Sequence, residues 1–219
     1  MNDNIVYILK HERLNNITRK EYHALQKEYA TKIIEYELQR RYIDIKDCII
    51  NKNRYGKPYF ENYQDIKYNV SHCNGMVAVA FSKDEIGIDI EDIKIYRTNI
   101  ISKLCTNEEV DYIKNGDYSN KRFFKIWTLK EAYMKAIGMG FAYSPKDVTF
   151  VIDEKEMLDD KKNDDSFNDN NITIKRKKID NVKVHQKELK GGYILSLCSL
   201  SANNCNTSLV YIDESSLRK

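Results

Sequence analysis

Three carboxylates in two separate stretches of this sequence have the types and spacing of a metal site. Asp89 and Glu91 belong to GIDIE at 87–91, and Glu131 follows in a later stretch. If 87–91 is a strand, Asp89 and Glu91 point the same way, because side chains alternate between the two faces of a strand. Adjacent carboxylates repel each other and are costly to bury without a cation. We therefore expect Asp89, Glu91 and Glu131 to hold Mg²⁺, with Mn²⁺ as the alternative.

Lysines beside the third carboxylate indicate a phosphate-bearing ligand. We expect a helix at 120–137 that ends at Gly138. Within it Lys130 adjoins Glu131, and Lys135 lies one turn further on, on the same face as Glu131. The alternative for each pattern alone is an ordinary charged surface, where a helix pair is worth about 0.3–0.5 kcal/mol. A phosphate ester bound together with the metal is the more informative hypothesis.

The elements that must position these residues can be outlined from the sequence. Thr18 and Glu21 have the spacing of a capping box at the start of a long helix. Asn74-Gly75 suits the turn of a hairpin, and a third antiparallel strand is expected to follow that hairpin directly. The expected helices are 18–43, 107–116 and 120–137; the expected strands are 5–9, 68–72, 76–82, 86–93, 172–177, 182–188, 193–200 and 208–212; the expected loops are 54–60 and 153–171.

Composition sets broad limits on the class of protein. The chain has 219 residues, 32% of them charged, and a net charge of +3, which fits one large or two small globular domains and gives no basic patch typical of nucleic-acid binding. The five cysteines form no CxxC pair, so neither a disulfide framework nor a zinc site is indicated. The apolar run at 5–9 is much shorter than the about 20 residues that cross a membrane. We expect a cytoplasmic protein with no membrane or nucleic-acid partner.

Four motifs in order give a more specific prediction. They are YGKP at 55–58, NVSHC at 69–73, GIDIE at 87–91 and WTLKEAYMKAIG at 127–138. Together they resemble the 4′-phosphopantetheinyl transferases of the long, surfactin-synthetase-activating type. The resemblance implies an α+β pseudo-dimer of two similar halves, each a small antiparallel sheet packed on a long helix. The halves would be residues 1–86 and 87–219, fused in a monomer with coenzyme A in the cleft between them.

The resemblance also implies a reaction. The 4′-phosphopantetheine arm of coenzyme A would pass to a serine of an apo acyl or peptidyl carrier protein, with release of adenosine 3′,5′-bisphosphate. The metal held by Asp89, Glu91 and Glu131 would bridge the pyrophosphate, and Glu131 would be the base that takes the serine proton. Lys130 and Lys135 would contact phosphate oxygens. The sequence does not indicate which carrier is the natural substrate.

Further coenzyme A contacts come from the matching positions. Ser71 and His72 fall where the family contacts phosphate, and Lys57 and Pro58 match a loop at the adenine or phosphate end. The candidates for the 3′-phosphate are Lys20 and Lys32. His11, His23 and His185 match no pattern. The family usually has Ser-His-Ser where this chain has Ser71-His72-Cys73, and we expect Cys73 to be a buried small residue without a catalytic role.

Two other functions remain open at this level. A degenerate family member could bind coenzyme A or a carrier without chemistry, although the intact carboxylates argue against this. An unrelated Mg²⁺-dependent nucleotide enzyme is the other possibility, and the absence of a Walker loop and of GxGxxG weakens it. Incubation with coenzyme A, Mg²⁺ and an apo carrier, followed by the mass of the carrier, discriminates among the three.

Overall fold

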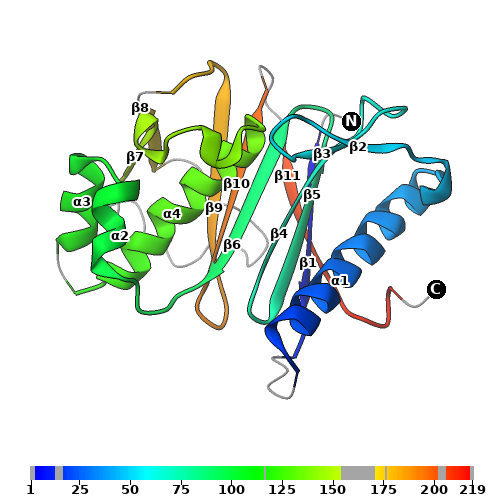
Figure 1. Cartoon of the computed structure of the whole chain (residues 1–219), viewed down its shortest axis with the longest axis horizontal. Helices are drawn as coiled ribbons and strands as arrows, with labels where there is room; N and C mark the ends of the chain where they lie inside the picture. Colours follow the sequence, from blue (N-terminus) through cyan, green and yellow to red (C-terminus); the bar gives the residue numbers. More distant parts are fainter. Residues whose placement is uncertain are drawn as a thin grey trace.

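A computed structural model describes residues 3–12, 17–115, 117–153, 171–175, 177–201 and 206–217. The expected loop at 153–171 lies outside the described residues except for its two end positions. Two sheets and two long helices dominate the described chain (Figure 1). None of the described helices is both long and apolar enough to cross a membrane.

The first sheet has four strands in the order β11-β1-β5-β4. β1 runs parallel to β11 and antiparallel to β5, and β5 runs antiparallel to β4. The predicted hairpin of β4 and β5 is confirmed, with Gly75 at a positive φ of 90° in its turn. The strand bounds are Asn4–Lys10 for β1, Lys67–Cys73 for β4, Met76–Ser82 for β5 and Thr207–Ile212 for β11.

The long helix α1 (Arg19–Arg40) covers one face of this sheet. Its start is as predicted: the Thr18 side chain accepts from the Glu21 amide, and the Glu21 side chain accepts from the Thr18 amide. Ile33 and Leu38 of the helix are fully buried against apolar residues of β1 and β5. The packing of these apolar side chains holds α1 on the sheet.

The second sheet has three antiparallel strands in the order β6-β10-β9. Helix α4 (Ser119–Ala136) packs on it through buried residues that include Leu129, Ala132 and Met134. The shorter helices α2 (Thr98–Leu104) and α3 (Asn107–Lys114) lie at the same end of the molecule (Figure 1). The strand bounds are Ile86–Asp92 for β6, Val182–Leu189 for β9 and Tyr193–Leu200 for β10.

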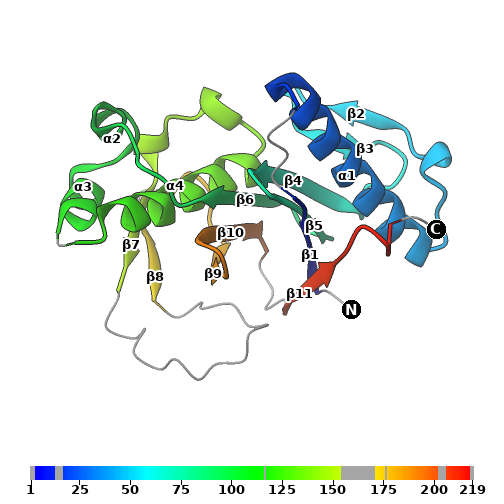
Figure 2. The same cartoon turned by 90° about the horizontal axis from the view of Figure 1, so that it is seen from below.

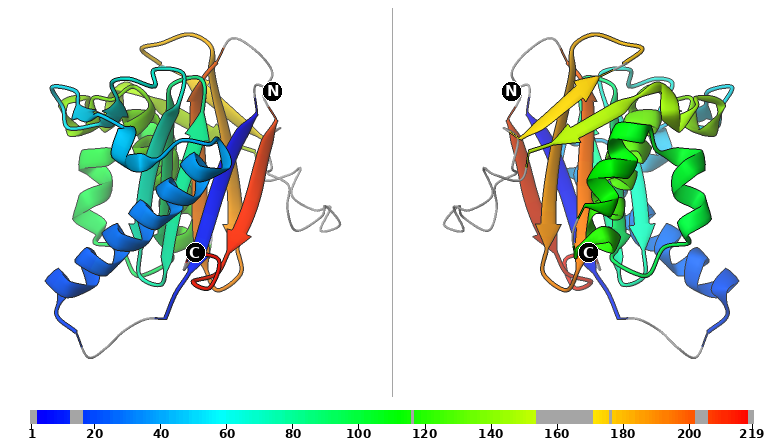
Figure 3. Two further views of the ribbon diagram at one scale, coloured as in Figure 1. Left: turned by 90° about the vertical axis from the view of Figure 1, so that its right-hand side faces the viewer. Right: turned by 90° about the vertical axis from the view of Figure 1, so that its left-hand side faces the viewer.

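The two sheets pack back to back between the long helices. Ile88 and Ile90 of β6 share one apolar cluster with Val6 and Ile8 of β1. The faces turned away from this cluster carry α1 on one side and α4 on the other, as the two end views of Figure 3 and the view from below in Figure 2 illustrate. The architecture is therefore mixed α+β.

Several short elements complete the described chain. The strand pairs are β2 (Ile50–Lys52) with β3 (Pro58–Phe60), and β7 (Thr149–Ile152) with β8 (Ile172–Lys175). The 3₁₀ turns are η1 (Ile45–Asp47), η2 (Gly140–Ala142) and η3 (Pro145–Asp147). The sequence did not predict α2, β2 or β7, and part of the expected loop 54–60 is β3.

One expected pairing is wrong. β6 does not continue the β4–β5 hairpin as a third strand; it pairs with β10 in the second sheet. Two side chains of β4 nevertheless reach its backbone: the Ile88 amide donates to Asn69 Oδ1 at 2.9 Å and the Ile90 amide to Ser71 Oγ at 3.2 Å. Side chains thus satisfy amides of β6 that no strand pairs. The strand β11, within the expected second half, likewise pairs with β1 of the first sheet.

Candidate active site

Helix α4 lies directly against strand β6 at Gly87. A Cβ atom at this position would be 2.1 Å from the carbonyl oxygen of Ala132 and 2.3 Å from the amide nitrogen of Ala136. Both neighbours are backbone atoms that cannot rotate away, so only glycine permits this approach. The contact brings α4 onto the face of β6 that carries Asp89 and Glu91.

Asp89 lies at the centre of the cluster that results. It is 5% exposed, and its Oδ1 accepts from Lys135 Nζ at 2.7 Å and from Ser71 Oγ at 2.8 Å. Lys135 Nζ also donates to the Ile88 carbonyl at 3.0 Å and to Ser71 Oγ at 3.1 Å. The structure thus brings together Ser71 from β4, Asp89 from β6 and Lys135 from α4.

Two carboxylate oxygens in this cluster have no hydrogen-bond partner among the described residues. They are Asp89 Oδ2 and Glu131 Oε1, and both are buried. Burial and the negative charge of Asp89 raise the pKa of Glu131 to about 7. The charge of Glu91 adds a smaller rise, and the positive charge of Lys135 lowers the pKa in part. Burial, followed by the charge of Asp89, also raises the pKa of Glu91. Unpartnered oxygens and mutual repulsion are what a bound cation would relieve.

The donor set therefore fits a hard divalent cation. Asp89, Glu91 and Glu131 offer carboxylate oxygens only, which is the ligand type that Mg²⁺ prefers. Within the part of the chain that the structure describes, no group of three or more His, Cys, Asp or Glu side chains is already arranged to hold a metal ion. The Lys135 ammonium instead neutralises one oxygen of Asp89.

Lys130 does not join this cluster, which corrects its predicted contact with phosphate. Its side chain is fully buried, and its Nζ lies 2.8 Å from Glu109 Oε2 and donates to the carbonyls of Pro145 and Val148 at 2.6 and 2.7 Å. Burial lowers the pKa of Lys130, while Glu109 opposes this effect. Three acceptors and no exposure leave no room for a ligand, so Lys130 ties α3 and the 145–148 segment to α4.

A cavity of about 940 Å³ opens beside Glu91 and is called here the basic cavity. Lys20, at the start of α1, and His72, on β4, both line it. The His72 ring lies 4.8 Å from that of His23, and burial, followed by the charge of His23, lowers the pKa of His72. The other lining residues are Arg19, Tyr22, Gln26, Cys73, Asn74, Asp92 and Lys94.

Lys32 is not among the residues that line the basic cavity. It forms an ion pair of 2.7 Å with Glu28 on the surface of α1. Twelve residues separate it from Lys20, which is about 18 Å along a helix. The two lysines cannot bind one phosphate group, and Lys20 is the one that lines the basic cavity.

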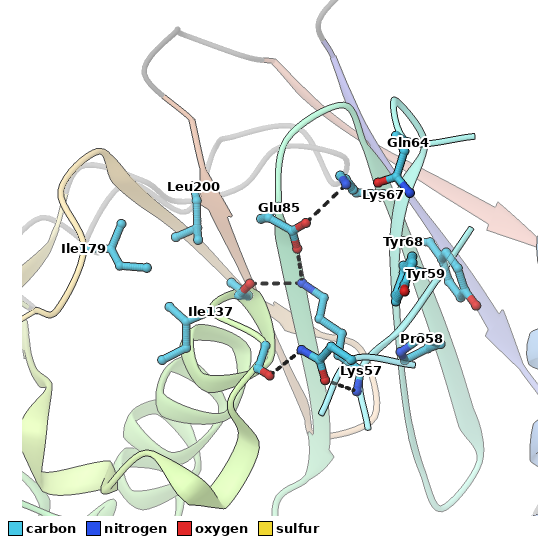
Figure 4. Close-up of a pocket in the computed structure, with 13 residues that line it drawn as sticks. Lys57, Pro58, Tyr59, Gln64, Lys67, Tyr68, Glu85, Ile137, Ile179 and Leu200 are labelled. Atoms are coloured by element: carbon cyan, nitrogen blue, oxygen red, sulfur yellow. Dashed lines mark hydrogen bonds and ion pairs between the residues drawn. The ribbon is translucent and has the colours of Figure 1, made fainter. Parts of the chain in front are cut away.

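A second cavity of about 450 Å³ lies beside the C-terminal end of α4 (Figure 4). Lys57 and Pro58 line it, together with Tyr59 of β3, Tyr68 of β4 and Ile137 after α4. Lys57 is 12% exposed, and its Nζ donates to Glu85 at 2.5 Å and to the Ala136 carbonyl at 3.0 Å. The expected loop thus joins the C-terminal end of α4.

Cys73 is buried, as expected, and its thiol shows no sign of activation. Burial and nearby carboxylates raise its pKa. A thiol with a raised pKa is a poor nucleophile at neutral pH.

Sequence reasoning missed several residues that the structure places here. His23 lies three residues after Lys20, so their shared helix face was a usable signal. Lys94, three residues after Glu91, had no such pattern. Glu109 occupies the third helical position of a capping box that begins at Thr106, but its pairing with a distant lysine had no local signal.

Comparisons with known proteins agree with this arrangement. Residues 85–198 match the 4′-phosphopantetheinyl transferase superfamily. The 4′-phosphopantetheinyl transferase gsp of Aneurinibacillus migulanus is 31% identical over 179 residues, which cover 81% of this chain and 69% of that protein. Sfp of Bacillus subtilis strain 168 is 29% identical over half of each chain, and ffp of Bacillus subtilis is 31% identical over 50% of this chain and 49% of ffp. The matched residues include strand β6, helix α4 and the carboxylate cluster between them. The chain belongs to the 4′-phosphopantetheinyl transferase superfamily.

Proposed function

We propose that this enzyme transfers the 4′-phosphopantetheine arm of coenzyme A to a serine of an apo acyl or peptidyl carrier protein. The observation that carries the proposal is the cluster of Asp89, Glu91 and Glu131, which holds unpartnered buried oxygens beside Lys135. In the reaction the serine Oγ forms a bond to the phosphorus that bears pantetheine, and the bond from that phosphorus to adenosine 3′,5′-bisphosphate breaks. The serine proton must leave as this bond forms.

Glu131 is the proposed acceptor of that proton. Glu131 lies beside Asp89, and its buried Oε1 has no hydrogen-bond partner among the described residues, so it can accept a proton directly or through a water molecule. Asp89, Glu91 and Glu131 would hold a bound Mg²⁺, which would neutralise negative charge on the phosphates. The Lys135 side chain is 25% exposed at the cluster, so its ammonium can turn from Asp89 to a phosphate oxygen.

The two cavities support an extended position for coenzyme A. Tyr68 and His72 belong to the same strand, and four residues of strand span about 13 Å. The basic cavity offers Lys20 and His72 to phosphate, whereas the cavity at Lys57 offers Tyr59, Tyr68 and Ile137 to a flat base. The pyrophosphate would then lie between them, at Asp89 and Lys135.

The proposal includes a pseudo-dimer of residues 1–86 and 87–219, with the active cleft between the halves. Each long helix covers one sheet, and β4 meets β6 at the carboxylate cluster, which supports this division. Ser71 comes from the first half, and Asp89 and Lys135 from the second. One chain therefore supplies all of these groups, in agreement with a monomeric enzyme.

A mass measurement tests the proposed reaction. The protein is incubated with coenzyme A, Mg²⁺ and a panel of apo carriers, and each carrier is weighed intact. We expect one phosphopantetheine addition to at least one carrier and none to the same carrier with its serine replaced by alanine. Binding of coenzyme A without any mass change would favour the degenerate binding protein, and absence of both would overturn the proposal.

A further inference from the structure

Two side chains of β4 take the place of a neighbouring strand along one edge of β6. β6 pairs with β10 on one side, and within the described part of the chain no strand pairs with its other edge. Asn69 and Ser71 are two residues apart on β4 and therefore face the same way. They accept from the Ile88 and Ile90 amides of β6, and these two contacts fix β6 against β4.

Asn69 is joined to the active site through one residue of β6. Its side chain is 6% exposed and lines neither the basic cavity nor the cavity at Lys57. Its Oδ1 accepts from the Ile88 amide at 2.9 Å, and the Ile88 carbonyl accepts from Lys135 Nζ at 3.0 Å. Lys135 Nζ in turn donates to Asp89 Oδ1 at 2.7 Å. Asn69 thus holds the backbone to which the lysine and the carboxylate of the site are bonded.

The Ser71 hydroxyl makes the second contact, and its bonding capacity is fully used. A hydroxyl has one hydrogen to donate and two lone pairs with which to accept. Ser71 Oγ donates to Asp89 Oδ1 at 2.8 Å and accepts from the Ile90 amide at 3.2 Å and from Lys135 Nζ at 3.1 Å. A shift of β6 relative to β4 would therefore change the contacts of Asp89 together with those of the backbone.

We propose that Asn69 is a positioning residue that fixes β6 against β4 and thereby sets the places of Asp89 and Lys135. The proposal rests on the proposed function and adds a residue that acts through others and not on the ligand. Without the accepting oxygen, the buried Ile88 amide must move or find water. A displacement of about 1 Å at catalytic groups can cost about 100-fold in rate, so the loss belongs to kcat more than to the KM for coenzyme A.

Three variants separate positioning from general stability. Asn69→Leu removes the accepting oxygen at similar size and should lower kcat about tenfold or more, with the KM for coenzyme A within about twofold of wild type. Asn69→Asp keeps an accepting oxygen in the same position and should recover most of kcat, even where the added charge lowers Tm. The control is Asn62→Leu, because Asn62 Oδ1 also accepts from a backbone amide, that of Ile49 at 2.9 Å, and lines neither cavity. Asn62→Leu should keep the wild-type kcat, and all rates are measured at a temperature where circular dichroism shows every protein folded.

Hydrogen exchange tests the contact without catalysis. In the metal-free protein the Ile88 amide, followed by NMR, should exchange about tenfold or more faster in Asn69→Leu than in wild type or Asn69→Asp. An unchanged kcat in Asn69→Leu, or a kcat that follows Tm across the variants and not the accepting oxygen, would overturn the positioning role alone. An unprotected Ile88 amide in wild type would overturn the contact itself. A wild-type protein that modifies no carrier would overturn the proposed function and this inference with it.

Discussion

At the scale of single residues, the carboxylate oxygens of the cluster differ in how many hydrogen-bond and ion-pair partners they have. Asp89 has one oxygen bound to Lys135 and Ser71 and the other without a partner among the described residues. The ion pair of Glu91 with Lys94 is long, at 3.4 Å, and half-exposed. Residues kept in an unfavourable state in the free protein are expected where a ligand will stabilise them.

Replacing Glu91 with glutamine should therefore affect activity and not stability. The raised pKa of Glu91 means that its charge is unfavourable in the folded protein, so Glu91→Gln should keep or raise the Tm at pH 8 without metal. Transfer should fall by about 100-fold or more, because one charged ligand of the proposed metal is lost. The matched control is Asp84→Asn, which changes an acid in the turn before β6 that lines neither cavity and should retain transfer. A Glu91→Gln protein with a near-normal rate would contradict the metal assignment.

The titration of Glu131 gives a test of the cluster in the metal-free protein. Because its pKa is raised to about 7, the neutral form stabilises the fold; this contribution is fully present below the unfolded value near 4.5 and is lost as pH rises through 7. Wild type should lose about 2 to 3 kcal/mol relative to Glu131→Gln between pH 4.5 and pH 8. Urea unfolding of both proteins at several pH values measures the difference. Parallel stability curves would contradict the raised pKa.

Replacing Lys130 should mainly reduce stability, whereas replacing Lys135 should mainly reduce activity. Lys130→Met breaks a fully buried ion pair with Glu109, which typically costs about 3–5 kcal/mol. Lys135→Met should change stability less, because its side chain is 25% exposed, and should mainly reduce kcat/KM. Adding Glu109→Gln to Lys130→Met should recover part of the lost stability, since no charge is then left unpaired. Equal Tm values for wild type and Lys130→Met would show that the pair is not structural.

At the scale of elements, local signals were sufficient for some predictions and not for others. The capping box at Thr18 and the Asn74-Gly75 turn act between neighbours in the sequence, and the helix and hairpin that they predict are present. The pairing of β6 with β10 joins residues about a hundred positions apart, and a short turn after β5 wrongly favoured a local third strand. Side-chain patterns near a strand cannot indicate such a distant partner.

The sequence also could not predict that the Lys130 side chain enters the core and not the active site. Helix α4 packs on β6 and β10 on one side and contacts α3 and β7 on another, so buried positions occur nearly all round it. A helix buried on several faces has no single apolar stripe that would reveal which face is the site. Consecutive residues Lys130 and Glu131 therefore looked alike in the sequence, although one enters the core and the other meets Asp89.

The contact of β6 with α4 can be tested at Gly87. Gly87→Ala places a methyl group against the α4 backbone, so the helix must move, at a cost of about 1–3 kcal/mol or more. Transfer should also fall sharply, since a shift of about 1 Å at catalytic groups can cost about 100-fold. The control is Gly140→Ala, where the space is open and only the positive φ of 51° is unfavourable. A Gly87→Ala protein as stable and active as wild type would contradict the close approach.

At the scale of the whole molecule, polar contacts join the first sheet and the loop at 53–57 to β6 and α4 around the carboxylate cluster. Asn69 and Ser71 of the first sheet accept from the backbone of β6, and Asn53 and Lys57 donate to carbonyls at the end of α4. These polar contacts surround the carboxylate cluster, while the back-to-back apolar core lies behind it. The site is thus held by both sheets, and the return of β11 to β1 ties the end of the described chain to its beginning.

Salt should change the KM for the carrier more than the affinity for coenzyme A. Carrier docking through exposed cations is screened by ions, so the KM for the carrier should rise several-fold between about 50 mM and about 500 mM salt. Coenzyme A should lose less affinity, because its proposed contacts at Asp89 and Lys135 are largely buried and screening there is weak. Both constants are measured at each salt concentration. A wild-type carrier KM that stays constant over this range would mean that the carrier docks through apolar contacts alone, even if transfer itself proceeds as proposed.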